Sequence, residues 1–144
     1  MTQENKDLLL KDLCARLPYG VKISVNDKVE TVQGINILDT VVEYDSWLSS
    51  DIEEVKPYLF PMSSMSEEQS MQLFKLFVIS SVDSIGANYI KINECTGITF
   101  FLDKGFNVET HLDKLIDWLN KNHLDYRGLI PMDLAIDATG LNIY

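Results

Sequence analysis

Hydrophobic residues recur at helical spacing in three parts of the chain. Leucines stand four positions apart within residues 3–17, so they share one face of a helix that Pro18 ends. A broad apolar face predicts a second helix over residues 67–82. A third apolar stripe predicts a helix from Thr110, which can cap it, to about Asn122. We therefore expect about three helices, each with one face turned toward a core.

Alternating apolar and polar positions predict strands between the first two helices. The apolar residues of 21–25 share one face, and Asn26 and Asp27 suit a tight hairpin because both tolerate positive φ angles. Residues 29–37 and 40–44 continue as second and third strands. Three consecutive strands with short connections predict an antiparallel meander that can curl like a small barrel.

Other segments complete a prediction of a single α+β domain spanning residues 1–144. Gly34, inside the second strand, indicates a bulge or a bend. The stretch KPYLFPMSSM, residues 56–65, has prolines four apart, which predicts an extended or turned linker over the sheet. Residues 89–93 and 98–102 predict a second hairpin. Nothing repeats along the chain, and no Gly- or Ser-rich linker divides it.

The charge of the chain limits its partners. Its 144 residues carry a net charge of −10, from 22 acidic and 12 basic side chains. This balance argues against direct binding to nucleic acid or to an anionic membrane, because both need a basic face. An acidic excess fits a solvated surface, a cationic partner, or a protein that mimics nucleic acid.

Residues that hold metals or cofactors do not cluster in the sequence. Cys14 and Cys95 are far apart and belong to no C-x-x-C or Cys/His group, so we expect neither zinc nor a disulfide. The sequence has no phosphate-binding loop, no dinucleotide fingerprint, and no metalloprotease or serine-hydrolase motif. The N-terminus has no signal-peptide core, and no apolar run approaches 18 residues. We expect no cofactor, no membrane segment and a cytoplasmic location.

The stretch KNHLDYRGLI, residues 121–130, gathers the groups from which acid–base sites are built. His123 can act as a base oriented by Asp125, with Arg127 holding an anionic substrate. The structural alternative is that His123 interacts with the dipole of a helix end and Arg127 pairs with a carboxylate to fix a loop. A binding surface for a partner that includes Tyr126 is the third interpretation.

Two further segments contribute candidate binding residues. Tyr19, in LPYG, and Tyr58 and Met62, in KPYLFPMSSM, carry large side chains that suit binding if they are exposed. If these segments meet the HLDYRG stretch in space, their tyrosines and Arg127 form an aromatic and arginine patch, the composition of binding hot spots. Arg16, at the end of the first helix, is expected to pair with a carboxylate or to bind a partner.

Three blocks, LLLKDLCARLPYGVK (8–22), VKPYLFPMSSMSEEQ (55–69) and WLNKNHLDYRGLIPMDLAIDA (118–138), resemble a known family. The family comprises short uncharacterised proteins of Bacteroides-type gut bacteria and their phages or prophages. The blocks match in order and spacing over nearly the whole chain, but the resemblance does not extend to residues 70–105. It implies a bacterial, cytoplasmic protein associated with mobile elements, and it implies no activity, cofactor or catalytic residue.

These observations lead us to expect a non-enzymatic interaction or accessory protein of phage or prophage type, which binds another macromolecule, a protein in the first instance. Two alternatives stay open. One is a small enzyme that acts on an anionic substrate through His123 and Arg127. The other is an acidic mimic of nucleic acid that blocks a DNA-binding protein, which requires the carboxylates to form one stripe.

Overall fold

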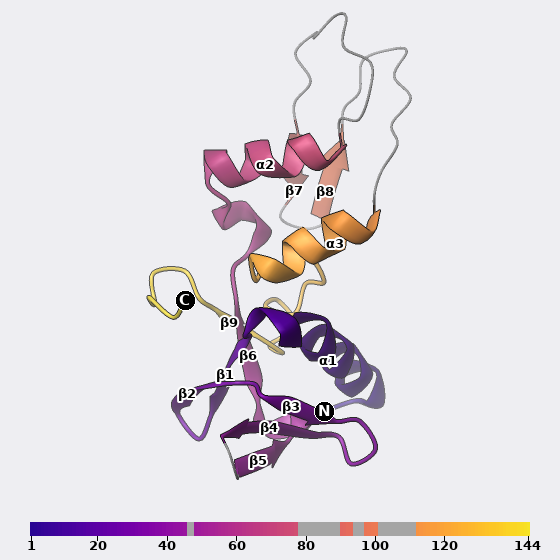
Figure 1. Cartoon of the computed structure of the whole chain (residues 1–144), viewed down its shortest axis with the longest axis vertical. Coiled ribbons are helices and arrows are strands. Elements are labelled where there is room, and N and C mark those ends of the chain that lie inside the picture. The colour runs from indigo at the N-terminus through magenta and orange to yellow at the C-terminus, as the bar shows by residue number, and fades with distance from the viewer. Residues whose placement is uncertain (46–47, 78–89, 94–96, 101–111) are drawn as a thin grey trace, which may run out of the picture.

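Three helices stand where the apolar periodicity predicts them. The computed structural model of the chain (Figure 1) describes residues 1–45, 48–77, 90–93, 97–100 and 112–144. The helices are α1 (Gln3–Arg16), α2 (Glu67–Phe77) and α3 (Leu112–Lys121). Single 3-10 turns follow at η1 (Leu17–Tyr19), η2 (Ile52–Glu54) and η3 (Met62–Ser64). The predicted end of the second helix and the predicted cap Thr110 lie outside the described residues.

Side-chain caps define where two of these helices begin. Thr2 accepts a hydrogen bond from the N–H of Asn5 at 3.3 Å, which satisfies one free donor of the first turn of α1. At the start of α2, Gln69 N–H donates to the Ser66 hydroxyl at 3.1 Å. The Gln69 amide oxygen accepts in return from the N–H of Ser66 at 3.0 Å. The predicted capping box is confirmed.

The strands form three sheets, and the described strands form no closed barrel. The first, in the order β2-β1-β6-β9, contains β1 (Lys22–Val25), β2 (Lys28–Thr31), β6 (Lys56–Leu59) and β9 (Ile136–Asp137). The second contains β3 (Gly34–Asn36), β4 (Val41–Asp45) and β5 (Leu48–Asp51). The third is the predicted second hairpin, β7 (Ile90–Asn93) and β8 (Gly97–Phe100). The α+β fold class is confirmed.

The first hairpin follows directly from its turn residues. Asn26 and Asp27 have φ angles of 49° and 59°, as a two-residue type I′ turn requires. The turn joins β1 to β2, and the two strands pair antiparallel. Ile23 and Val25 of β1 are buried. The predicted apolar face of residues 21–25 is confirmed.

The prediction of one continuous three-strand meander is wrong. Residues 29–37 split between β2 and β3, which belong to different sheets. The break falls at Val32 and Gln33, whose N–H groups bond the carbonyls of Val21 and Glu43. The predicted bulge or bend inside one strand at Gly34 is not found, because Gly34 is the first residue of β3 and pairs with Glu43, and the break just before it separates two sheets.

The proline-rich segment is extended over β6 and turned at η3, as predicted, but β6 is a central strand of the first sheet and not a linker over it. Strand β6 pairs antiparallel with β1, where Pro57 faces Ile23, and parallel with β9. Proline has no N–H to donate to a neighbouring strand. The pairing of β6 with β1 covers only two residues, so Pro57 removes few hydrogen bonds from the sheet. The parallel pair also corrects the prediction that the sheet is antiparallel throughout.

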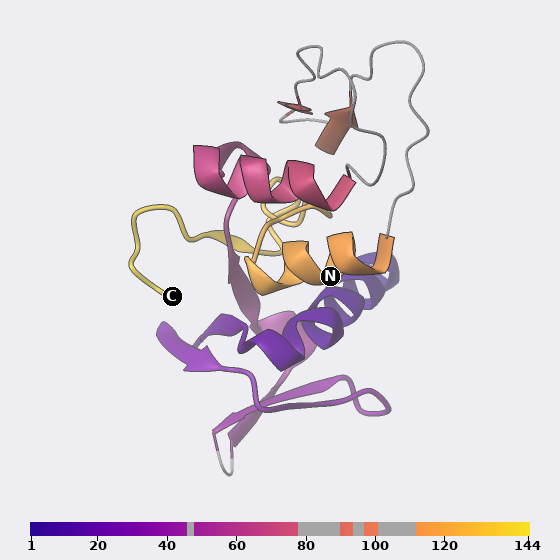
Figure 2. The same cartoon turned by 45° about the horizontal axis from the view of Figure 1, so that its top comes forward.

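Two apolar clusters meet where β6 leaves the sheet. The larger one packs α1 against β1, β4 and β6 and includes Leu9, Ile23 and Leu59. The smaller one joins α2 and α3 around Leu73 and Leu119, and Phe60 packs against it. Helix α3 lies between α2 and α1 (Figure 2). The loop after α3 therefore emerges at the boundary between the two clusters.

Replacing Ser66 by alanine removes one side of the capping box and should lower the free energy of unfolding by about 1 kcal/mol. Urea unfolding followed by circular dichroism measures the change. Ser63→Ala, at an exposed position of η3, is the matched control and should stay within about 0.5 kcal/mol of wild type. Equal effects of the two substitutions would contradict a role for the cap.

Candidate functional site

Helix α3 ends on a histidine whose backbone adopts a conformation usually taken by glycine. His123 has a φ angle of 52°, and its N–H donates to the carbonyl of Asn120 at 3.1 Å. The N–H of Leu124 donates to the carbonyl of Leu119 at 3.1 Å. These two bonds form a Schellman motif, in which the left-handed residue is normally glycine or asparagine. The helix end thus holds His123 in an uncommon conformation for its type.

The imidazole of His123 is buried and uncharged at neutral pH. The residue is 7% exposed, and burial, together with the nearby charge of Arg16, lowers its pKa to about 4. Its Nδ1 atom has no hydrogen-bond partner among the described residues. A neutral imidazole has no net charge for the helix dipole to attract, so the predicted interaction with the dipole contributes little to the position of His123.

Asp125 shapes the loop that follows. Its carboxylate accepts hydrogen bonds from the N–H groups of Leu129 at 2.7 Å and Ile130 at 2.8 Å. Gly128, with a φ angle of 74°, lets the chain turn back so that these donors reach the carboxylate. The carboxylate oxygens thus face the loop backbone, which leaves Asp125 poorly placed to orient the imidazole of His123.

Arg127 and Arg16 share one buried carboxylate, Asp12 of α1. Asp12 and Arg16 are both 0% exposed, and Arg16 binds both carboxylate oxygens, with Nε at 2.7 Å and Nη2 at 3.0 Å. The Nε atom of Arg127 donates to the same carboxylate at 3.0 Å. Arg16 Nη2 also donates to the carbonyl of Leu124 at 2.8 Å. This Asp12 cluster (Asp12, Arg16 and Arg127) ties α1 to the loop after α3.

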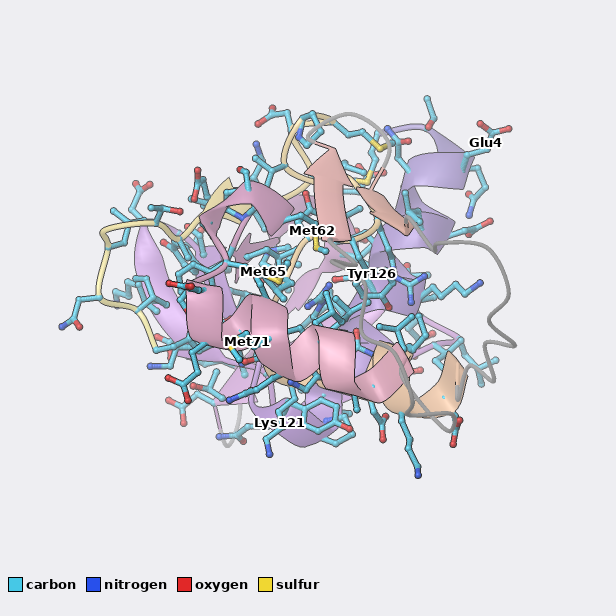
Figure 3. The ribbon with its side chains drawn as sticks, turned by 90° about the horizontal axis from the view of Figure 1, so that it is seen from above. Glu4, Met62, Met65, Met71, Lys121 and Tyr126 are labelled. Carbon is cyan, nitrogen blue, oxygen red and sulfur yellow. The ribbon has the colours of Figure 1, made fainter. Side chains whose placement is uncertain are left out.

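Tyr126 lies against the two guanidinium groups of the Asp12 cluster. Its ring centroid is 4.7 Å from Cζ of Arg127 and 5.4 Å from Cζ of Arg16, within the range of cation–π attraction. Its hydroxyl donates to the side-chain oxygen of Asn120 at 3.1 Å. Burial raises the pKa of the phenol, so Tyr126 is a neutral structural contact. In the view from above, Tyr126 is nearer the middle of the outline than Glu4, which lies at its edge (Figure 3).

The ring of His123 stacks on the ring of Tyr144, with centroids 3.9 Å apart and an angle of 13° between planes. Phe60 contacts the same ring at a centroid distance of 5.9 Å. The Tyr144 hydroxyl accepts a hydrogen bond from the N–H of Lys22 at 3.1 Å and donates to the carbonyl of Tyr58 at 2.8 Å. Burial raises the pKa of this phenol to about 12. We call Lys22, Tyr58, Phe60 and His123 the tyrosine slot.

The three sequence blocks meet, but at a largely buried junction. Met62 is 7% exposed and belongs to the smaller apolar cluster, where it lies near Met65 (Figure 3). Tyr19 is half-buried, and a hydrogen bond to Asp117 of α3 raises the pKa of its phenol. Tyr58 is half-buried and enters the tyrosine slot through its carbonyl. The open patch of tyrosines and Arg127 therefore has little exposed area, and a binding role for these residues stays a prediction.

The structure contains an exposed apolar turn that the sequence pattern did not predict. Ile37 is 62% exposed and Leu38 is 95% exposed, between strands β3 and β4. The side-chain oxygen of Asn36 accepts from the N–H groups of Leu38 and Asp39 at 3.1 and 3.3 Å, so the turn is held by its own first residue. The signal was a pair of aliphatic residues flanked by turn-forming Asn36 and Asp39. We call Ile37 and Leu38 the apolar turn.

In the parts of the chain that the structure describes, no three His, Cys, Asp or Glu side chains gather in a way that could hold a metal ion. None of the described helices has the length and apolarity needed to cross a membrane. Comparison of the chain with family models, with curated proteins and with solved structures finds no match. The function must therefore be argued from the contacts of the described residues.

Changing Asp12 to asparagine should lower the free energy of unfolding by roughly 3 kcal/mol or more, because it leaves the two arginines of the Asp12 cluster without their counterion. Urea unfolding at pH 7 measures the change. Asp7→Asn, at an exposed position of the same helix, is the matched control, with an expected effect below about 0.5 kcal/mol. A loss of under 1 kcal/mol for Asp12→Asn would show that the cluster contributes little to stability.

Acidification should destabilise the protein through His123. The folded-state pKa of about 4 lies below the value near 6.5 of an unfolded chain. The unfolded state therefore binds the proton more readily, and the contribution of His123 is complete above pH 6.5 and is lost as the pH falls toward 4. Between pH 7 and 5, wild type should lose roughly 2 kcal/mol more than His123→Asn.

Asparagine suits this comparison because it tolerates the left-handed backbone and does not titrate. Urea unfolding of both proteins at several pH values measures the difference. Parallel pH profiles for the two proteins would contradict a depressed pKa at His123.

Proposed function

We propose that this protein is a non-enzymatic interaction or accessory protein, of phage or prophage type and cytoplasmic, that binds a protein partner through the apolar turn. The observation that carries the proposal is the exposure of two adjacent large aliphatic side chains, with Leu38 at 95%. The resemblance of the three sequence blocks supports the phage or prophage context.

The apolar turn is suited to binding because it is already ordered. In addition to its two backbone contacts, Asn36 donates from its side-chain nitrogen to Asp39 at 2.7 Å. Beyond the turn, the N–H of Ile52 donates to the carbonyl of Thr40 at 3.0 Å, which holds the base of the turn against η2. A preformed turn loses little conformational entropy on binding. Each fully buried Ile or Leu side chain then contributes roughly 1.5–3 kcal/mol.

Charge around the apolar turn indicates the chemistry of the partner. Asp39 adjoins Leu38, and Asp51 pairs with Val41 at the start of β4, and both aspartates are exposed. The chain as a whole carries a net charge of −10. A matching partner has an apolar cleft with a basic rim, since complementary charge speeds association and suppresses wrong partners.

The alternative of a small enzyme acting through His123 and Arg127 has less support. Arg127 is paired with Asp12, His123 is buried beneath Tyr144, and Asp125 binds loop N–H groups. Groups held in this way contribute to packing and loop geometry. The same contacts agree with an accessory role, in which Asp125 and Arg127 support the fold and the apolar turn binds the partner.

Affinity capture from lysate of the native host with wild type, Leu38→Asp and Leu48→Asp tests the proposal. Leu48 is the matched control, because it is 53% exposed on β5 of the same sheet, at the end away from the apolar turn. We expect a protein that is retained by wild type and by Leu48→Asp and lost with Leu38→Asp.

Binding of the purified partner should weaken at least tenfold for Leu38→Asp, as for a hot-spot residue. Circular dichroism of each variant shows that the fold is kept. The proposal fails if the captured proteins and their affinities are the same for all three baits.

A further inference from the structure

Residues 139–144 form a segment in which Ile143 and Tyr144 make hydrogen bonds to β1 and β6. Thr139, Gly140, Leu141 and Asn142 are exposed, and the backbone is left-handed at Gly140 and Asn142. At its base, the N–H groups of Thr139 and Leu141 donate to the side chain of Asp137 in β9 and to the carbonyl of Ala138. Beyond these local bonds, the described hydrogen bonds from the segment are those of Tyr144 and the carbonyl of Ile143. In Figure 1 the segment is the yellow loop that stands apart from the helices. A segment held at one point opens locally at low cost.

The tyrosine slot recognises every part of a phenol ring. His123 covers one face of the ring and Phe60 approaches it at an angle of 49°. The N–H of Lys22 and the carbonyl of Tyr58 supply one donor and one acceptor to the hydroxyl group. A ring without the hydroxyl loses both hydrogen bonds. The contacts therefore favour tyrosine over phenylalanine.

The slot also recognises the peptide backbone before the tyrosine. Lys22 Nζ donates to the carbonyl of Ile143 at 2.7 Å and lies 5.9 Å from the centroid of the Tyr144 ring. One lysine thus contacts both the ring and the preceding carbonyl. A free phenol would satisfy only the ring contacts, so an extended peptide segment ending in or containing tyrosine fits the slot better.

His123 departs from the usual rules at the floor of this slot. It has a positive φ angle, a buried ring and an Nδ1 atom without a partner among the described residues. Strained and unsatisfied groups concentrate at binding and switch sites, since a stability cost persists where a function requires it. The ring of Tyr144 stacks on His123 and is itself 42% exposed. A ring from another polypeptide can therefore reach this position and compete with Tyr144 for it.

We infer that the tyrosine slot is a peptide-binding site for a tyrosine side chain of a partner polypeptide, and that Tyr144 is its intramolecular occupant. When residues 139–144 detach, the partner's tyrosine stacks on His123 and takes the hydrogen bonds of Lys22 and Tyr58. The site is separate from the apolar turn, so the inference does not depend on the proposed function.

The test uses the Tyr144→Ala variant of the whole 144-residue chain and a fluorescent peptide with the sequence of residues 139–144. Tyr144→Ala should bind this peptide at least tenfold more tightly than wild type, because the tethered Tyr144 competes at high effective concentration. A peptide with phenylalanine in place of tyrosine should bind at least tenfold more weakly, and a scrambled peptide should not bind. Binding is measured by anisotropy, and amide shifts of Lys22, Phe60 and His123 locate it.

Tyr144→Phe provides a second route if Tyr144→Ala does not fold. It keeps the ring but loses the two hydrogen bonds of the hydroxyl, so it competes less well for the slot and should bind the tyrosine peptide more tightly than wild type. The inference is overturned if folded variants show no saturable binding, if wild type and the variants bind alike, or if the two peptides bind alike. A wild-type dimer with exchanged segments at micromolar concentration would overturn the assignment to a partner.

Discussion

The arrangement of this protein depends on one buried carboxylate that serves two arginines. Asp12 binds Arg16 one helical turn away and Arg127 at a distance of 115 residues in the chain. Two cations and one anion in a buried position would be unstable without further partners. The carbonyl of Leu124 and the ring of Tyr126 supply them. The cluster therefore forms only when α1, the end of α3 and the following loop are all in place.

The position of this loop in turn determines how the rest of the junction is built. Once Arg16 holds the carbonyl of Leu124, the loop backbone pairs with Phe60, which accepts from Asp125 and donates to His123. Strand β6 is thereby linked to both apolar clusters. The groups that looked like an acid–base site are used in this linkage, and their geometry is that of a structural junction with a neutral histidine.

Two features stand outside this structural explanation. The apolar turn exposes Ile37 and Leu38 although its backbone is held by hydrogen bonds. Under Tyr144, His123 keeps a left-handed backbone and a nitrogen that has no partner among the described residues. Proteins break local rules most often where a function compensates for the cost. Both features are therefore better guides to function than the density of polar residues in KNHLDYRGLI.

The sequence by itself determined the elements whose signals are local. Helical spacing, the Ser66–Gln69 capping box and the Asn26-Asp27 turn depend on neighbours within a few residues, and each is confirmed. Only the tertiary structure decided how these elements pair. Residues 29–37 alternate like one strand, yet they divide at Val32 and Gln33 between two sheets, because pairing is set by distant partners and not by periodicity. The Asp12 cluster and the tyrosine slot join residues about 115 to 122 positions apart. Side-chain type alone does not reveal such contacts, since burial decides whether a histidine or arginine acts as a site or as a support.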